Sequence, residues 1–165
     1  MRTINKEIKL FSLDELDQRA RDRAIDSLRG AQVDHDWWDC TYDDAKRVGL
    51  KITSFDLDRS RHAEGEFIDG ALNCANAILK EHGEGCETRS DALTFLTAFD
   101  ALPDQDSDDY RDDDFDEIEG EFLKALCESY SLILQREYEY LTSDEAIEEM
   151  IAANEYEFTE EGDLY

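Results

Sequence analysis

The stretch DDFDEIEGEFLKALCESYSLILQREYEY, residues 113–140, is the longest regular pattern in the chain. Its apolar residues recur every three or four positions, the spacing that gathers side chains on one face of an α-helix. The candidates for burial are Ile118, Phe122, Leu126, Tyr130, Ile133 and Leu134. At about 1.5 Å per residue, the pattern predicts a single helix roughly 40 Å long.

Shorter helical patterns flank this stretch. Ser12 with Glu15 and Thr142 with Glu145 fit capping boxes, in which a hydroxyl and a carboxylate satisfy free amides at a helix start. Gly or Pro follows several of the patterns, as expected at helix ends. The predicted helices cover about 13–28, 36–48, 69–82, 89–102 and a short segment after Thr142.

Two segments have the composition of strands. LKITSFDLD (50–58) and HAEGEFI (62–68) predict a hairpin across Arg59–Arg61. Residues 3–10 predict an edge strand or an arm, and EYEFTEEGDLY (155–165) predicts a terminal hairpin. The whole predicts an α+β fold, with five or six helices packed on a small, mostly antiparallel sheet and one long acidic helix.

The predicted organisation is a single domain made of three consecutive parts. A helix and hairpin part covers 1–103, an acidic loop covers 104–112, and the long helix, a short helix and the terminal hairpin cover 113–165. The chain has 165 residues and 41% hydrophobic residues, which is enough apolar material for a packed core.

The charge is extreme and uneven. The run DQDSDDYRDDDFDEIEGE (104–121) holds eleven acids among eighteen residues, with Arg111 as its only cation. The net charge is −27, of which residues 1–83 carry −4 and residues 84–165 carry −23. Such a surface repels nucleic acid and anionic membranes, and it attracts basic proteins or metal cations.

The sequence predicts a cytoplasmic protein, and specifically one in the cytoplasm of a host cell. Residues 1–10 lack the apolar core of a signal peptide, and no apolar run approaches the length of a membrane span. The four cysteines lie far apart and form no CxxC pair, which is typical of reduced thiols.

Two places in the sequence combine residues that can bind a metal ion. Starting at Asp104, an EF-hand loop would place Asp109 where glycine is needed and Phe115 where a bidentate glutamate is needed. Cys74, His82 and Cys86 have the wrong spacing for a structural zinc site. The sequence therefore predicts no dedicated metal site and no cofactor.

An enzymatic role is the third alternative. Acidic residues and a histidine on the predicted hairpin could hold a metal for phosphoryl transfer, although a solvated hairpin face looks the same. They are Asp56, Asp58, His62, Glu64 and Glu66. No GxSxG, phosphate loop, GxGxxG or HExxH motif occurs in the chain, and we predict that it is not an enzyme.

Mimicry of nucleic acid fits the magnitude of the charge. Duplex DNA carries one charge per about 1.7 Å, so 27 net charges match about 46 Å of duplex. Tyr110 and Phe115 could serve as apolar anchors, or could pack the acidic loop onto the domain. The predicted partner-binding residues are Asp108, Asp109, Tyr110, Asp112, Asp113, Asp114, Phe115, Asp116, Glu117 and Glu121.

Two plainer explanations stay open at this point. Residues 104–112 could be a solvated acidic linker, although that leaves the remaining excess charge unexplained. Adaptation to high salt would account for abundant Asp and scarce Lys, but it should spread the charge evenly over the chain.

The segments KLFSLDEL, DHDWWD, GLKITSFDLDR, EGEF and EYEYLTSDEAIEEMIAANEYEFTEEG carry a resemblance that covers nearly the whole chain. Together they resemble a family of small acidic proteins of phages and prophages, for which no activity is described. The resemblance implies a phage- or mobile-element-encoded inhibitor of a host defence protein, such as a CRISPR effector or a restriction enzyme, acting at a Lys/Arg-lined DNA site. The alternative is a non-enzymatic acidic adaptor that binds a basic host or phage protein.

Overall fold

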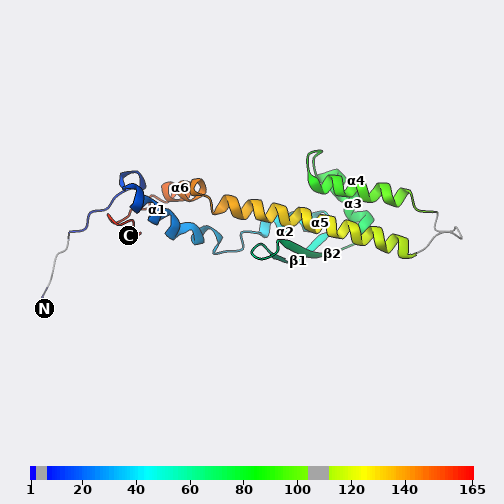
Figure 1. Cartoon of the computed structure of the whole chain (residues 1–165), viewed down its shortest axis with the longest axis horizontal. Helices are drawn as coiled ribbons and strands as arrows, with labels where there is room; N and C mark the ends of the chain where they lie inside the picture. The colour runs from blue at the N-terminus through cyan, green and yellow to red at the C-terminus, as the bar shows by residue number, and fades with distance from the viewer. Residues whose placement is uncertain (3–6, 104–111) are drawn as a thin grey trace. The chain divides into compact units, whose positions relative to one another are not determined.

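The computed structural model describes residues 1–2, 7–103 and 112–165. These residues form two compact units (Figure 1). The terminal unit combines Met1–Trp37 with Glu137–Tyr165, and the central unit is Trp38–Arg136. The described residues contain six α-helices and a two-stranded antiparallel sheet, so the predicted α+β class with one long helix is confirmed.

The two units divide the chain differently from the three consecutive parts that the sequence predicted. Each unit has a hydrophobic cluster of its own, and the cluster of the terminal unit joins residues from both ends of the chain. Leu13 and Ile25 meet Ile147 and Phe158 there. Helical periodicity shows which face of a segment is buried but not which distant segment covers it, and for this reason the sequence missed the division.

The central unit contains most of the elements. They are α2 (Asp39–Arg47), β1 (Leu50–Asp56), β2 (His62–Phe67), α3 (Ala71–Glu81), α4 (Glu87–Asp100) and the greater part of α5 (Asp112–Leu141). Gly49, with a φ of +91°, makes the sharp turn between α2 and β1, a conformation that only glycine adopts without strain. The predicted long helix is confirmed to within one residue at each end.

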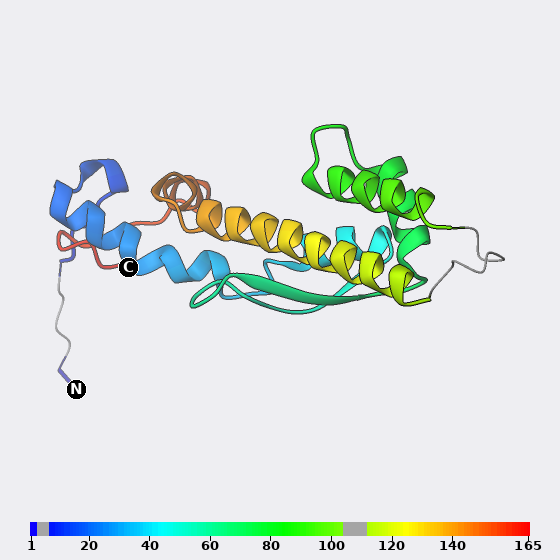
Figure 2. The ribbon, with the colours of Figure 1, turned by 45° about the vertical axis from the view of Figure 1, so that its right-hand side comes forward.

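The hairpin is confirmed, with an irregularity in its register. Leu50 pairs with Phe67, and the pairing shifts by one residue between Ile52 and Ser54. Along β2, Ala63, Gly65 and Phe67 are half-buried, while the residues between them are exposed. The hairpin and α5 run side by side in both views (Figure 1, Figure 2).

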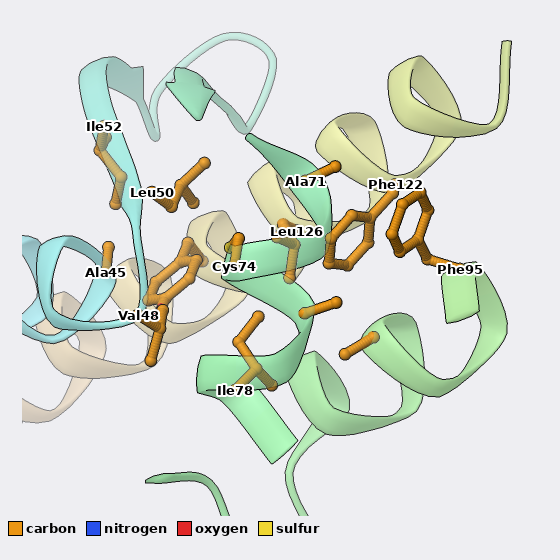
Figure 3. Packing of buried hydrophobic residues seen from close by; sticks show 13 residues of the cluster. Ala45, Val48, Leu50, Ile52, Ala71, Cys74, Ile78, Phe95, Phe122 and Leu126 are labelled. Carbon is orange, nitrogen blue, oxygen red and sulfur yellow. The ribbon is translucent and has the colours of Figure 1, made fainter. Parts of the chain in front are cut away.

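Aromatic stacking joins the sheet, α5 and α4 in the core of the central unit, and Figure 3 shows the rings of Phe122 and Phe95 from this stack. The ring of Phe122 stacks on Phe67 at 5.5 Å and on Phe95 at 4.6 Å between centroids. Leu126 and Tyr130, one and two turns further along α5, are fully buried. The inward face of α5 is therefore the one that its periodicity predicted.

The terminal unit contains two helices, α1 (Gln18–Leu28) and α6 (Asp144–Ala153), with short 3-10 turns at Leu13–Glu15 and Arg29–Val33. The predicted terminal hairpin is present only as isolated bridges, which pair Phe158 with Phe11 on one side and Leu164 on the other. The fully buried Phe158 thus ties the C-terminal segment to the start of the first helical turn.

The predicted capping box of Ser12 and Glu15 is confirmed, although at a 3-10 turn, and the one at Thr142 and Glu145 needs correction. Ser12 and Glu15 do bond to each other, but they open the 3-10 turn, and α1 starts later with Asp17 accepting from Ala20 N at 2.9 Å. At the second helix the cap is Ser143, whose Oγ accepts from Ala146 N at 3.2 Å. The hydroxyl of Thr142 instead donates to the carbonyl of Tyr138 at the end of α5. Thr142 and Ser143 both have side chains that can cap a helix, and only the path of the backbone decides which of them does so.

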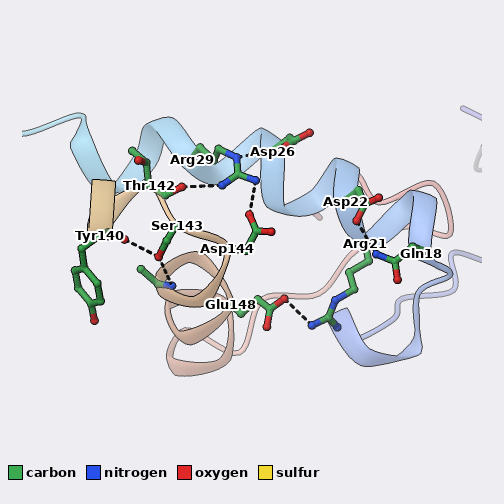
Figure 4. Close-up of polar contacts among 11 residues, drawn as sticks. Gln18, Arg21, Asp22, Asp26, Arg29, Tyr140, Thr142, Ser143, Asp144 and Glu148 are labelled. Carbon is green, nitrogen blue, oxygen red and sulfur yellow. Dashed lines mark hydrogen bonds and ion pairs between the residues drawn. The ribbon is translucent and has the colours of Figure 1, made fainter. Parts of the chain in front are cut away.

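Arginines hold the terminal unit together (Figure 4). Arg21 bonds to Asp14 at 3.0 Å and to Glu148 at 2.7 Å, so it links the 3-10 turn to α6. Arg29 bonds to Asp26, to Asp144 and to the carbonyl of Thr142. Several acids of this unit are therefore matched by a cation from a distant part of the sequence.

Candidate functional site

The first half of α5 exposes a face of carboxylates, which we call the acidic face. It consists of Asp112, Asp113, Asp116, Glu117 and Glu121, all of which are exposed. Residues three and four apart lie next to each other on a helix, so the side chains from Asp113 to Glu121 form one continuous stripe. Five of the ten residues that the sequence proposed for partner binding are thus brought together on one surface.

The acidic face differs from three paired acids of the central unit, Glu66, Glu87 and Glu128. Glu128 bonds to Arg61 at 2.5 Å, Glu66 to Lys51 at 2.6 Å and Glu87 to Arg136 at 3.4 Å. Within the described ranges, none of the five carboxylates of the acidic face makes an ion pair or hydrogen bond. The face therefore has no cation from the described part of its own chain.

The spacing of these carboxylates carries an energetic cost. Asp113, Glu117 and Glu121 repeat every four residues, and like charges at that spacing destabilise a helix by a few tenths of a kcal/mol per pair, or about 0.2–0.5. The positive end of the helix dipole offsets this cost within the first turn but not at Glu121. The arrangement is unfavourable for the isolated fold, and a cationic partner would relieve it.

The other predicted site residues lie elsewhere. Asp108, Asp109 and Tyr110 lie outside the described residues. Phe115 is half-buried, and its ring meets Phe99 edge-on at 5.9 Å against the central core, so the structure supports packing over a surface anchor. Asp114, beside it, is only partly exposed.

Folding also changes how the charge is distributed. The two halves of the sequence differ strongly, but the acidic C-terminal segment joins the N-terminal one in the terminal unit. The terminal unit carries 19 acids and 7 Lys/Arg, net −12, and the central unit carries 25 and 10, net −15. The unequal net charges of the two halves of the sequence therefore no longer argue against salt adaptation. The case for a binding site rests on the unpaired acidic face.

The hairpin acids have local roles. Asp56 Oδ1 accepts from the backbone amides of Asp58 at 2.8 Å and Arg59 at 3.4 Å, which shapes the turn. Glu64 accepts from the hydroxyl of Ser54 at 3.0 Å. In the described portion of the chain, no group of three or more His, Cys, Asp and Glu side chains is placed to hold a metal ion.

A buried polar network, which sequence reasoning missed, connects α2, α3, α4 and α5. Tyr130 donates to Asp44 at 3.0 Å, and His82 Nδ1 lies 2.7 Å from the hydroxyl of Thr88. His82 Nε2 is buried, 3.4 Å from Asp44 Oδ2, without a hydrogen bond among the described atoms. Burial, followed by the charge of Asp44, raises the pKa of Tyr130, so it stays a neutral donor. The network fixes these helices together.

A groove of about 770 Å³ lies between β2 and α5. Its lining includes Ala63 and Gly65 from the strand and Gly120, Leu123 and Cys127 from the helix. A Cβ added at Gly65 would lie 2.9 Å from the carbonyl of Lys51 and 3.5 Å from the sulfur of Cys127, so glycine allows strand and helix to approach closely. Sequence reasoning missed this groove because it forms between two distant segments, in which Gly65 and Gly120 are 55 residues apart.

Gly120 has no such packing role. A Cβ added there would meet no atom within 4 Å. Glycine in an exposed helix interior costs roughly 1 kcal/mol relative to alanine. This glycine, visible in the sequence as an interruption of a good helical pattern, leaves a notch in α5 that the packing of the described residues does not require.

The thiols give a direct check of the central core. Cys40 and Cys86 are exposed, while Cys74 and Cys127 are buried. Burial raises the pKa of Cys74 to about 12, and burial followed by the charge of Glu64 raises that of Cys127.

Since the thiolate is the reactive form, we expect a disulfide reagent to modify two thiols rapidly in native protein and four in guanidinium. Replacing both exposed cysteines by serine should abolish the rapid phase; a fast third thiol would contradict the burial.

None of the described helices combines the length and apolar composition needed to cross a membrane. No family model matches the chain, and neither does any curated protein or solved structure with which it was compared.

Proposed function

We propose that the acidic face of α5 binds a Lys/Arg-lined nucleic-acid site of another protein, in competition with nucleic acid. The observation that supports this most is the unpaired stripe from Asp113 to Glu121 on a rigid helix. The buried residues Phe122 and Leu126 fix this helix to the core, so its carboxylates are held at fixed spacing. A partner would therefore meet a preorganised array of charges.

The spacing of the array suits this role. From Asp113 to Glu121 a helix rises about 12 Å, and four exposed carboxylates lie within that rise, one per about 4 Å. Phosphates along one strand of B-DNA follow each other at about 3.4 Å of axis. Cations arranged to receive successive phosphates would meet carboxylates at a similar average axial interval.

The resemblance to small acidic phage proteins suggests which proteins to try. The proposal is that the chain inhibits a host defence protein such as a CRISPR effector or a restriction enzyme, whose DNA channels are rich in Lys and Arg. A non-enzymatic adaptor for a basic host or phage protein would use the same surface, and it differs in one respect: nucleic acid need not displace it.

The test is displacement. Tagged full-length protein is used to capture partners from a bacterial lysate, and the bound fraction is then challenged with short duplex DNA at constant ionic strength. A neutral-backbone duplex of the same length serves as the control. We expect the DNA, but not the neutral duplex, to release one nucleic-acid-binding protein or complex.

The same experiment separates the alternatives. A partner that resists DNA but leaves at high salt indicates the adaptor, and it contradicts competition for a nucleic-acid site. Binding that is unchanged between low and high salt contradicts both, since exposed charges are screened over about 8 Å at physiological ionic strength.

A further inference from the structure

The outer edge of β2 presents backbone groups that the hairpin does not use. The amide of Ile68 donates to the carbonyl of Gly49 at 2.8 Å, which sets the phase of the ladder. Bonded and non-bonded pairs alternate in an antiparallel ladder, so Leu50–Phe67 and Ile52–Gly65 are the non-bonded pairs. The N–H and C=O groups of Gly65 and Phe67 therefore point away from β1.

No other strand covers this edge in the part of the chain that the structure describes. There, β2 pairs with β1 alone, and no backbone hydrogen bond from another segment reaches Gly65 or Phe67. An uncovered strand edge is a template for a further strand, and proteins bind extended peptides in this way.

The groove between β2 and α5 lies beside the same edge. It is lined by β2 and α5 without any residue of β1, so it opens on the outer side of β2. Ala63, Leu123 and Cys127 give it an apolar floor, and Glu64 and Glu121 stand at its rim. The notch at Gly120 widens it on the helix side, where open space surrounds the position and only a large side chain would fill it.

We infer that this groove binds an extended basic segment of a protein partner, added to β2 as a third strand. The inference rests on the proposed function, since it supplies the apolar and backbone contacts for the cationic partner that the acidic face would attract. Alternating side chains of the segment would point to the floor and outward, and Lys or Arg at the outward positions would meet Glu64 and Glu121.

Continuity of charge supports this occupant. Glu121 belongs both to the acidic face and to the rim of the groove, so one cationic surface can contact both. Lys124 and the Arg61–Glu128 pair balance the charge toward the other end. A second copy of the chain, with a net charge of −27, would be repelled rather than attracted.

The test uses isotope-labelled full-length protein and a defined probe, a short capped peptide that alternates lysine and valine. A matched peptide, methylated at alternate backbone nitrogens, keeps the charge but loses donors for strand pairing. We expect the first peptide to slow hydrogen exchange of the Gly65 amide at least about tenfold and to bind at least about tenfold more tightly than the second.

Variants at Gly120 provide the second arm. Gly120→Trp should weaken peptide binding at least about tenfold by filling the notch. Gly120→Ala should leave binding within about twofold and raise Tm by about 2–4 °C, because alanine favours the helix and meets no neighbour.

The outcomes distinguish this inference from the proposed function. If both peptides bind equally and the Gly65 amide exchanges as before, the groove is not a strand-binding site. If the captured partner is released by DNA but is insensitive to Gly120→Trp, this inference fails and the proposed function stands. If peptide-free protein forms dimers with a protected Gly65 amide, the occupant is a second copy and the inference is overturned.

Discussion

Replacing Asp113, Asp116, Glu117 and Glu121 together by lysine is expected to weaken partner binding about a thousandfold. Exposed ion pairs contribute roughly 0.2–1 kcal/mol each, and reversal both removes the attraction and adds a repulsion of similar size. Four reversals then cost roughly 2–8 kcal/mol, and about 4 kcal/mol, near the middle of that range, is about a thousandfold in Kd. Calorimetric titration of the captured partner measures the loss.

The matched control makes the same change of charge on the terminal unit. Glu145, Glu149, Glu157 and Glu160 are exposed there, and replacing all four by lysine alters the net charge by the same amount. We expect this variant to retain affinity within about tenfold, as a loss of long-range attraction alone would give. Circular dichroism confirms that both variants fold.

Equal losses in the two variants would show that net charge, rather than the acidic face, governs binding. That result would favour salt adaptation, an explanation that is compatible with the even distribution of charge between the two units. Full retention by the acidic-face variant would place the interface elsewhere.

Gly162→Ala is expected to destabilise the protein by roughly 3–4 kcal/mol, a large part of the total stability of a typical domain. Gly162 is buried and has a φ of +83°, a left-handed conformation that costs another residue roughly 1–2 kcal/mol. A Cβ would also lie 2.2 Å from the carbonyl oxygen of Ala20, so the backbone of α1 must move.

The physical reason lies in how the C-terminal segment packs. Gly162 N donates to the carbonyl of Thr159 at 3.0 Å, and the next residue, Asp163, bonds to Arg23 of α1 at 2.5 Å. This turn holds Phe158 in the core of the terminal unit. Moving α1 away to admit a methyl group would weaken both the ion pair and the apolar contacts.

Urea unfolding followed by circular dichroism measures the effect, with Gly30→Ala as the control. Gly30 lies in the same unit, but a Cβ there meets nothing within 4 Å and its φ is not left-handed. The control should change stability by less than about 1 kcal/mol. Wild-type stability for Gly162→Ala would contradict the close approach of this turn to α1.

Local patterns in the sequence determined much of the central unit. The periodicity of residues 113–140 predicted both the extent of α5 and its buried face, because a helix repeats its environment every three to four residues. The strand composition around Arg59–Arg61 predicted the hairpin for a similar reason. The periodicity of residues 113–140 also indicated the acids of the acidic face, since charged residues on the side opposite an apolar stripe remain exposed.

Contacts between distant segments were decided by the tertiary structure alone. Phe115 lies among acids in the sequence, yet its ring packs against Phe99 of α4, 16 residues away. Asp44 meets Tyr130, and Arg29 reaches the start of α6, across separations that no spacing rule covers. The groove beside Gly65 and the pairing of acids in the terminal unit follow from the same cause. Sequence periodicity specifies which face of an element is buried, but only three-dimensional packing selects the residues that cover that face and the carboxylates that remain without a cation.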